Sequence, residues 1–288
     1  MSGTQKSFDP NHYKRTTKEQ WETAAEAWHR WGSLLNKWLG PATETMFDMA
    51  GITTGSRVLD VAAGAGEQTI AVARRVGDAG SVLATDLSPS ILKYAAQSAK
   101  DAGLTNVTTQ ELDGEHLDKL DEASFDAVIS RVGFIYFPDQ QKALHGMMHS
   151  VKEGGKIAAM VYSTADKNGF FSVPVSIIRR RANLPAPLPQ QPGPFSLGGD
   201  GVLEGLFVQA GLKDVEVHVI DAPVRVQSVK ECLDFERESF GALHQMLSGL
   251  SESEQKETWE EIEQELNKFQ TNGSFEGPCE LVVAVGTK

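Results

Sequence analysis

A segment of small residues early in the chain is the first feature that could do chemistry. It covers residues 60–66 with the sequence DVAAGAG and follows a short apolar strand. Small side chains let a ligand approach the backbone closely, and a helix beginning just after the loop would offer free N–H groups to a negative group. Asp86 lies twenty residues beyond Gly66, where a carboxylate can accept both hydroxyl protons of a ribose. The pattern predicts a nucleoside-type ligand.

Dinucleotide oxidoreductases use the same loop geometry, so the loop alone does not decide the ligand. Two residues argue against a dinucleotide here: Thr69 stands where that fingerprint has Gly or Ala, and Asp60 would face a pyrophosphate. A carboxylate repels a phosphate but attracts an ammonium group. The ligand is therefore expected to carry a cation close to Asp60.

The elements that position this loop are strands that alternate with helices from residue 57 onward. Alternation of this kind predicts parallel strands joined by right-handed crossover helices, which is a doubly wound α/β sheet. The nucleoside would then lie at the carboxyl ends of the strands. The expected strands are 57–61, 81–85, 107–111, 125–129, 156–162, 214–220 and 280–286, and the expected helices among the first five are 68–76, 89–100 and 140–151.

Further helices are expected to fold over this core as a cap. Large apolar residues recur at three- and four-residue steps over 21–38, which predicts a helix that begins behind a capping box of Thr17 and Gln20 and ends at Gly40-Pro41. Prolines crowd 185–194, and later helices are expected at 202–210, 229–247 and 252–269. We expect one domain over 1–288, with cap helices at 17–50, a cofactor-binding core at 56–163, a proline-rich lid or linker at 164–200, and late strands with inserted cap helices at 201–288.

The composition is that of a globular protein with a strongly acidic balance. The 288 residues carry a formal net charge of −12, and a field of that sign repels phosphate backbones, so nucleic acid is not expected as a substrate. No apolar stretch approaches the roughly 20 residues that a membrane span needs. The two cysteines, Cys232 and Cys279, favour a reducing, cytoplasmic location. A homodimer would be an ordinary assembly, although no sequence feature specifies one.

Five segments in order resemble the motifs of class I S-adenosylmethionine-dependent methyltransferases. Residues 60–66 resemble the first motif, with Ala62 in place of its first glycine, and residues 85–88 resemble the second. The others are 112–115 (LDGE), 124–139 around strand four and its exit, and 151–155 (VKEGG) before strand five. Within that class the chain resembles the ubiquinone/menaquinone-biosynthesis type of C-methyltransferase and its small-molecule relatives. The resemblance implies a Rossmann-like seven-stranded sheet, mostly parallel with an antiparallel last strand, under a helical cap.

The resemblance also implies S-adenosylmethionine as cofactor and S-adenosylhomocysteine as product. Asp86 would bind the ribose hydroxyls, and Leu87 would pack on the adenine. Asp113 would accept a hydrogen bond from the adenine amino group, with the Gly114 backbone against the ring, and Arg131 would line the cavity near the sulfonium. A solvated loop pair is the alternative for Asp113 and Arg131. The methionine end would be held by Asp60, Ala62, Gly64, Gly66 and Gln68.

No general base can be named from the sequence, because methyl transfer needs one only when the acceptor must lose a proton. His116, Tyr13 and Tyr136 are the candidates. His145 and His149 lie four residues apart on a helix, but no third ligand accompanies them, so no metal is expected.

Aromatic residues are the candidates for substrate contacts, namely Trp28, Trp31, Phe134 and Phe195, although an aromatic stripe such as that of the two tryptophans is more often a buried helix face. The resulting hypothesis is an enzyme that transfers a methyl group by in-line displacement to a carbon or oxygen of a small, partly apolar molecule. Two alternatives stay open: an NAD(P)-dependent oxidoreductase, and a non-catalytic protein that binds S-adenosylmethionine.

Overall fold

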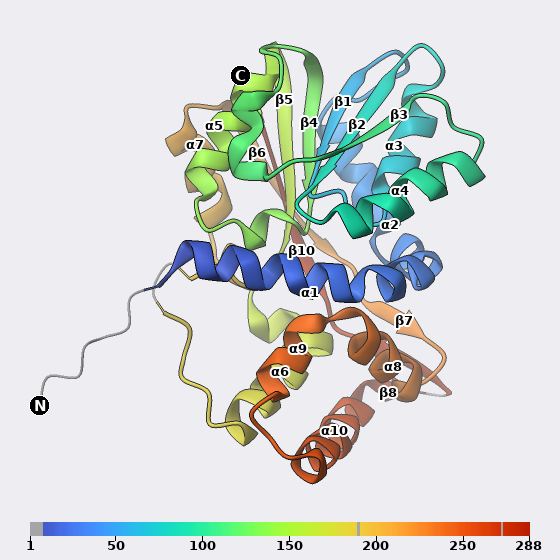
Figure 1. The fold of residues 1–288 in the computed structure, drawn as a ribbon, viewed down its shortest axis with the longest axis vertical. Coiled ribbons are helices and arrows are strands. Elements are labelled where there is room, and N and C mark those ends of the chain that lie inside the picture. Colours follow the sequence, from blue (N-terminus) through green and yellow to red (C-terminus); the bar gives the residue numbers. More distant parts are fainter. Residues whose placement is uncertain (1–7, 189–190, 272) are drawn as a thin grey trace, which may run out of the picture.

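A seven-stranded sheet forms the centre of the computed structural model, which describes residues 8–188, 191–271 and 273–288. Its order is β3-β2-β1-β4-β5-β10-β6 (Figure 1). The strands β1 to β5 pair in parallel, and β10 pairs antiparallel with both β5 and β6. The predicted doubly wound sheet with an antiparallel last strand is confirmed. The strands are β1 (Arg57–Val61), β2 (Ser81–Asp86), β3 (Val107–Glu111), β4 (Phe125–Arg131), β5 (Val151–Tyr162), β6 (Lys213–Asp221) and β10 (Glu280–Thr287).

Helices between the strands cover both faces of this sheet. The chain runs outward from β1 to β3 and then returns to β4 and β5 on the other side of β1. Right-handed crossovers therefore put the helices of the two halves on opposite faces. The reversal between β1 and β4 opens a crevice at the carboxyl ends of these strands, which is where α/β sheets bind ligands. The helices are α3 (Glu67–Val76), α4 (Pro89–Asp101), α5 (Gln140–Ser150) and α7 (Val202–Ala210), with the short 3-10 helices η1 (Gly114–Lys119) and η2 (Phe134–Tyr136) beside the crevice.

The first helix, α1 (Pro10–Arg30), begins earlier than predicted. Its N-cap is Asp9, whose side chain accepts hydrogen bonds from the backbone N–H groups of Asn11 and His12 at 3.0 Å each. The expected capping box at Thr17 was wrong, because Thr17 lies buried inside the helix, and the cap segment predicted to start at residue 17 starts at Pro10 instead. Figure 1 shows α1 lying across the molecule, between the sheet and the C-terminal helices.

The second helix, α2 (Gly32–Met49), also departs from the prediction. The expected single helix over 21–38 is divided near Trp31, and the expected end at Gly40-Pro41 was wrong because Pro41 lies inside α2. Proline removes one helical hydrogen bond and costs roughly 3 kcal/mol. The helix continues because the residues after Pro41 bury apolar surface against the sheet, with Met46 and Phe47 fully buried.

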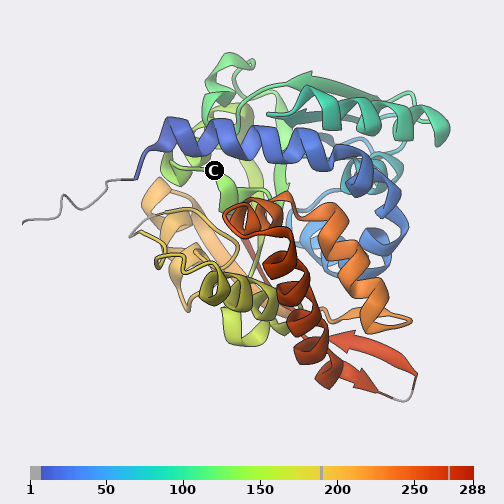
Figure 2. The same cartoon turned by 60° about the horizontal axis from the view of Figure 1, so that its bottom comes forward.

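The cap consists of α6 (Gly169–Arg181), α8 (Val229–Ser239), α9 (Gly241–Leu247) and α10 (Glu252–Leu266), with the 3-10 helices η3 (Ala165–Lys167) and η4 (Asn267–Phe269). The expected proline-rich linker at 164–200 contains α6 in its first half, and the expected helix at 229–247 is broken at Phe240. A small antiparallel sheet of β7 (Val224–Val226), β9 (Ser274–Gly277) and β8 (Gln270–Thr271) was not predicted. Its hairpin projects beyond α10 in Figure 2.

Glu236 on α8 is a fully buried carboxyl group inside this cap. Its Oε1 accepts a hydrogen bond from the Cys232 thiol at 3.7 Å, and its Oε2 has no hydrogen-bond partner in the described part of the chain. Burial raises the pKa of Glu236 well above its ordinary value, and the hydrogen bond from Cys232 opposes this only in part. The carboxyl group therefore holds its proton in the folded protein at pH values where it would lose it in the unfolded chain.

Glu236→Gln is expected to stabilise the protein at pH 8 and to change its stability little near pH 4. Below pH 4.5 the carboxyl is protonated in both states, so its burial costs the wild type little. As the pH rises toward the raised pKa of the folded protein, only the unfolded chain releases the proton, and the free energy of unfolding falls. Glutamine does not titrate, so by pH 8 the free energy of unfolding of the variant should exceed that of the wild type by on the order of 1–3 kcal/mol.

Urea unfolding of both proteins at several pH values from 4 to 8 measures this difference. Glu260→Gln, on the exposed face of α10, is the matched control and should show no comparable trend. A stability difference for Glu236→Gln that stays constant with pH would contradict the raised pKa.

Candidate cofactor and substrate site

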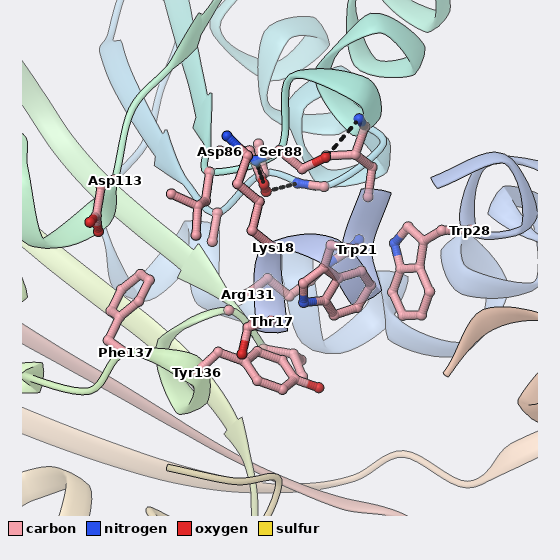
Figure 3. Close-up of a pocket in the computed structure, with 18 of the residues that line it drawn as sticks. Thr17, Lys18, Trp21, Trp28, Asp86, Ser88, Asp113, Arg131, Tyr136 and Phe137 are labelled. Carbon is pink, nitrogen blue, oxygen red and sulfur yellow. Dashed lines mark hydrogen bonds between the residues drawn. The ribbon is translucent and has the colours of Figure 1, made fainter. Parts of the chain in front are cut away.

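A cavity lies at the crevice between β1 and β4 and extends under α1. The space between its lining residues amounts to about 1040 Å³ when its opening to solvent is included. Figure 3 shows Asp113 and Trp28 at opposite ends of this view of the cavity, with Trp21 between them. The cavity thus has one polar end near β2 and β3 and one aromatic end near the cap.

The small-residue loop after β1 forms part of the cavity wall. Ala62 and Gly64 line the cavity and both have left-handed backbone conformations, with φ of 56° and 60°. The Ala63 N–H donates to the Thr85 carbonyl at 3.0 Å, which fixes the turn against β2. Gly66 lies outside the lining. A Cβ atom there would lie 2.9 Å from the Ala95 backbone of α4, so this glycine allows α3 and α4 to pack closely.

Ala62 and Gly133 lie close to each other just beyond the carboxyl ends of β1 and β4. A Cβ atom on Gly133 would lie 2.4 Å from the Cβ of Ala62. We therefore expect Gly133→Ala to destabilise the protein by roughly 1–3 kcal/mol. Ala62→Gly should be tolerated, because it removes a left-handed alanine that costs about 1 kcal/mol. The double variant should recover most of the loss.

Thermal unfolding of the two single variants and the double variant tests this coupling. Simple addition of the two single effects would show that Ala62 does not cause the crowding at Gly133.

Asp60 lies beneath the loop and not on the cavity wall. It is 0% exposed, and its carboxylate accepts hydrogen bonds from the Gln68 side-chain amide and, at 2.6 Å, from the Thr69 hydroxyl. Burial raises the pKa of Asp60 to about 6, against the lowering effect of these hydrogen bonds. Both carboxylate oxygens are thus engaged within the protein. Asp60 orients Gln68, which lines the cavity and whose Oε1 is buried without a hydrogen-bond partner in the described chain.

Arg131, at the end of β4, is a buried cation on the cavity wall, with 9% of its surface exposed. Its one hydrogen bond to the described residues goes to the Thr43 hydroxyl of α2 at 3.3 Å. Burial lowers the pKa of Arg131, whereas the negative charges of Glu67 and Asp60 raise it. A guanidinium group has five N–H donors, so most of them are available to an anionic group in the cavity.

Asp86 occupies the end of β2 at the polar end of the cavity. Its Oδ2 accepts a hydrogen bond from the Gly64 N–H at 3.1 Å, and its Oδ1 accepts one from the Ser88 N–H at 2.9 Å. Each oxygen keeps a lone pair for a further donor. Burial raises the pKa of Asp86, and the backbone hydrogen bonds lower it in part. The arrangement can accept two hydroxyl protons from one ligand. Leu87 lines the cavity next to it.

Asp113 lies farther along the same end, after β3. It accepts hydrogen bonds from the Glu115 N–H at 3.0 Å and from the Lys14 ammonium at 2.7 Å. Lys14 also contacts the Glu115 carboxylate at 2.8 Å, which ties α1 to this end of the cavity. Gly114 lines the cavity, and a Cβ atom there would lie 2.6 Å from the Phe137 ring, so the glycine lets that ring close over the wall.

The other end of the cavity is aromatic, and its residues come from α1, α2, the segment after β4, the end of β5 and the cap. Trp21 packs edge-to-face against both Trp28 and Tyr136, with ring centroids 5.2 and 5.7 Å apart. The hydroxyls of Tyr136 and Tyr162 make no hydrogen bond within the described residues, and burial raises the pKa of both. Both groups are therefore hydrogen-bond donors at neutral pH. The remaining lining residues here are Leu39, Val132, Gly133 and Phe240.

Several residues singled out from the sequence lie outside the cavity lining. The Trp31 indole donates to Glu238 at 2.6 Å, Phe134 is fully buried against Phe137, and Phe195 packs behind Tyr162. Of the candidate bases, only Tyr136 lines the cavity. Tyr13, whose pKa burial raises to about 12, and His116, 4.0 Å from Asp113, do not.

Several lining residues were missed, among them Lys14, Lys18, Tyr162 and Phe240. Tyr162 ends β5, and its place at the carboxyl end of a parallel strand was a usable signal. The histidines of α5, His145 and His149, each contact a backbone carbonyl, and no cluster of metal-binding side chains occurs among the described residues.

Comparison with known proteins agrees with this geometry. Residues 37–175 match the model of the ubiE/COQ5 methyltransferase family. The uncharacterized protein Mb1438c of Mycobacterium bovis is 31% identical over 221 residues, which make up 73% of each chain. The chain belongs to the ubiE/COQ5 methyltransferase family. Membership implies S-adenosylmethionine as the cofactor, as the sequence motifs suggested.

Two further comparisons place this ubiE/COQ5-family protein among its relatives. The ubiquinone/menaquinone biosynthesis C-methyltransferase UbiE of Idiomarina loihiensis is 33% identical over 117 residues, and this match spans 46% of that enzyme. A phosphoethanolamine N-methyltransferase of Haemonchus contortus superposes over 98% of this chain and 60% of its own, with a TM-score of 0.57 and 17% identity, which shows a shared fold. No helix among the described residues is long and apolar enough to cross a membrane.

The residues of this ubiE/COQ5-family site fit S-adenosylmethionine. An amino-acid end needs an acceptor for its ammonium group and a donor for its carboxylate. The unpartnered Oε1 of Gln68 and the donors of Arg131 without a partner among the described residues are buried polar groups of these two kinds in the cavity lining. The adenosine end needs acceptors for ribose hydroxyls and an amino group, which Asp86 and Asp113 can supply.

Proposed function

We propose that this protein transfers a methyl group from S-adenosylmethionine to a carbon or oxygen of a small, partly apolar molecule. The observation that carries the proposal is a single cavity with a polar end that contains Asp86 and Asp113 and an aromatic end that contains Trp21 and Trp28. S-adenosylmethionine, when bound, supplies a methyl group that its positively charged sulfur has already activated. The protein then needs mainly to hold the acceptor in line with that methyl group and to exclude water.

Different residues at the polar end would each bind a different part of the cofactor. Asp86 accepts from the ribose hydroxyls, Asp113 from the adenine amino group, and Arg131 donates to the methionine carboxylate. Gln68 accepts from the methionine ammonium group, which is the role first expected of Asp60. This assignment follows from the buried position of Asp60 and its hydrogen bonds to Gln68 and Thr69.

The aromatic end would bind the acceptor. Trp28, Leu39 and Phe240 offer an apolar surface that orients a planar or partly apolar molecule and keeps water away. Tyr136 and Tyr162 are protonated donors, so they would bind an acceptor oxygen and would not remove its proton. No histidine or carboxylate from the described residues lines this end. The site therefore suits an acceptor that is nucleophilic by itself, or becomes so when its oxygen is bound by donors.

Incubation with S-adenosylmethionine carrying a radioactive methyl group tests this proposal. A panel of phenols, carboxylic acids, β-dicarbonyl compounds and amines would be offered, and the methylated atom would be identified by mass spectrometry and NMR. We expect label on a carbon or oxygen acceptor, and no product with Asp86→Ala. Label only on amines would contradict the proposed acceptor type. Binding of S-adenosylhomocysteine without turnover of any acceptor would favour the non-catalytic alternative.

The oxidoreductase alternative has less support from the site. Thr69 is fully buried and its hydroxyl is bound to Asp60, so a larger side chain fills the position where the dinucleotide fingerprint has a glycine for close packing of helix against strand. The proposed cytoplasmic location rests on the cysteines, since Cys232 and Cys279 are both buried free thiols.

A further inference from the structure

Val132, directly after β4, has a left-handed backbone conformation with φ of 59°. Asparagine and aspartate adopt this conformation more readily than other side chains, and alanine brings only a Cβ atom into it. A β-branched side chain makes it a genuine outlier that costs stability. Val132 is the β-branched residue among the non-glycine residues of positive φ in the described chain, of which the others are Ala62, Ala123, Asn183 and Asp214.

The surrounding structure holds Val132 in this conformation. Its N–H donates to the Met160 carbonyl of β5 at 2.7 Å, which continues the pairing of β4 with β5. The next residue, Gly133, lies against Ala62, and its carbonyl accepts a hydrogen bond from the Tyr136 N–H at 3.0 Å. The chain therefore has to turn sharply at Val132 to pass from β4 into η2. Backbone strain that neighbours fix in this way is concentrated at functional sites.

The turn itself does not need a side chain. Glycine adopts positive φ about as readily as negative φ, so a glycine in place of Val132 would make the same turn without the strain. Val132 is half-buried, packs against the core and lines the cavity. Because the backbone gains nothing from a β-branched residue here, we expect the isopropyl group to serve the cavity.

Val132 lies where the two ends of the cavity meet. It follows Arg131, whose donors suit the methionine carboxylate, and it precedes Tyr136, which belongs to the acceptor end (Figure 3). Tyr162, at the end of the neighbouring strand β5, belongs to the acceptor end as well. In an in-line transfer the methyl group lies between the cofactor sulfur and the acceptor. The apolar side chain of Val132 is therefore at the part of the wall nearest to this boundary.

We propose that the Val132 side chain contacts the S-methyl group of bound S-adenosylmethionine and limits the size of the alkyl group that the site accepts. This inference rests on the proposed function. The two methyl groups of the valine occupy the space that a second carbon on the sulfur would need. They also offer no hydrogen bond, so they keep water away from the activated methyl group. An extra methylene in a packed apolar site lowers affinity roughly 10- to 100-fold.

Calorimetric titration with S-adenosylmethionine and with its S-ethyl analogue, S-adenosylethionine, tests this role. The wild type should bind the ethyl compound roughly 10- to 100-fold more weakly than the methyl compound. Val132→Gly removes the obstructing methyl groups and should reduce this ratio to about threefold or less. Val132→Thr keeps the branched shape and should preserve the ratio. S-adenosylhomocysteine carries no S-alkyl group, so its affinity is the reference for an intact cofactor site in each variant.

Thermal unfolding tests the strain at Val132 separately. Glycine is favoured over alanine in a left-handed conformation, so Val132→Gly should unfold roughly 2–4 °C above Val132→Ala. The reverse order would overturn the argument, because the backbone would then not be strained. Ala123→Gly is the matched control for the titrations, since Ala123 has φ of 51° outside the cavity lining, and its ratio of the two affinities should equal that of the wild type.

The titrations distinguish failure of this inference from failure of the proposed function. Equal affinities of the wild type for the methyl and ethyl compounds would overturn the inference alone. A preference for the methyl compound that Val132→Gly leaves unchanged would do the same, because another part of the wall would then contact the alkyl group. Failure of the wild type to bind any of the three adenosyl compounds would overturn the proposed function together with this inference.

Discussion

Asp86→Asn is expected to weaken the binding of S-adenosylhomocysteine by roughly 30- to 100-fold. Each oxygen of this carboxylate already accepts one backbone N–H, from Gly64 at 3.1 Å and from Ser88 at 2.9 Å. An amide in its place turns one acceptor into a donor, which faces one of those N–H groups and no longer accepts from a ribose hydroxyl. The loss therefore combines a broken ligand contact with a disturbed loop.

Asp126→Asn is the matched control for this change. Asp126 also accepts a backbone N–H from a neighbouring strand, that of Arg57 at 2.7 Å, but it lies outside the cavity. Calorimetric titration of the wild type and both variants measures the dissociation constants. Equal affinities for the wild type and Asp86→Asn would remove Asp86 from the ribose site. Equal losses in both variants would point to a general effect on the fold.

Arg131→Gln should weaken the binding of S-adenosylhomocysteine by roughly 10- to 100-fold and leave the binding of 5′-methylthioadenosine nearly unchanged. The first ligand carries the amino-acid end with its carboxylate, and the second lacks it. Arg131 is buried with one hydrogen bond to the described residues, at 3.3 Å to Thr43, so its other donors are free to meet that carboxylate.

Comparing S-adenosylhomocysteine with 5′-methylthioadenosine separates carboxylate binding by Arg131 from two other roles of this residue. Equal losses for both ligands would mean that Arg131 supports the cavity wall. Unchanged binding of both ligands, with a raised KM for an acceptor, would assign its charge to the acceptor. Thr43→Val removes the hydroxyl that accepts a hydrogen bond from the guanidinium of Arg131. This variant is the control and should change the binding of both ligands little.

The sheet was predictable from sequence because its signals are local. Short apolar strands, a glycine loop and helix caps such as Ser88, which accepts from the Ile91 N–H at 3.3 Å, each depend on a few neighbouring residues. The start of α1 was missed although its signal is local as well, since Asp9 caps the helix and Pro10 stands in its first turn. Thr17 has the pattern of a cap, but the helix extends past it to Pro10, and Lys14 in the added turns pairs with Asp113 and Glu115, about a hundred residues away.

The two ends of the cavity also differ in how far their residues could be predicted from the sequence. Asp86, Leu87 and the residues near Gly114 lie in compact motifs after parallel strands, so their place on the wall could be expected. The aromatic end joins residues as distant as Trp28 and Phe240, which meet only because the cap folds back over the sheet.

The small sheet of β7, β8 and β9 was missed because its strands of three, two and four residues carry no periodic pattern. The hydrogen bonds of the Asp60 carboxylate could not be predicted either, because only the fold brings Gln68 and Thr69 around it.

The most direct test of the central claim is a parallel titration of the wild-type protein with S-adenosylhomocysteine and with NADH. A cavity with an acceptor for ribose hydroxyls, a buried cation for a carboxylate and a buried carboxylate, Asp60, below its glycine loop predicts micromolar binding of S-adenosylhomocysteine and no measurable binding of NADH. Binding of NADH alone would contradict the assignment of this cavity to methyl transfer and would favour hydride transfer.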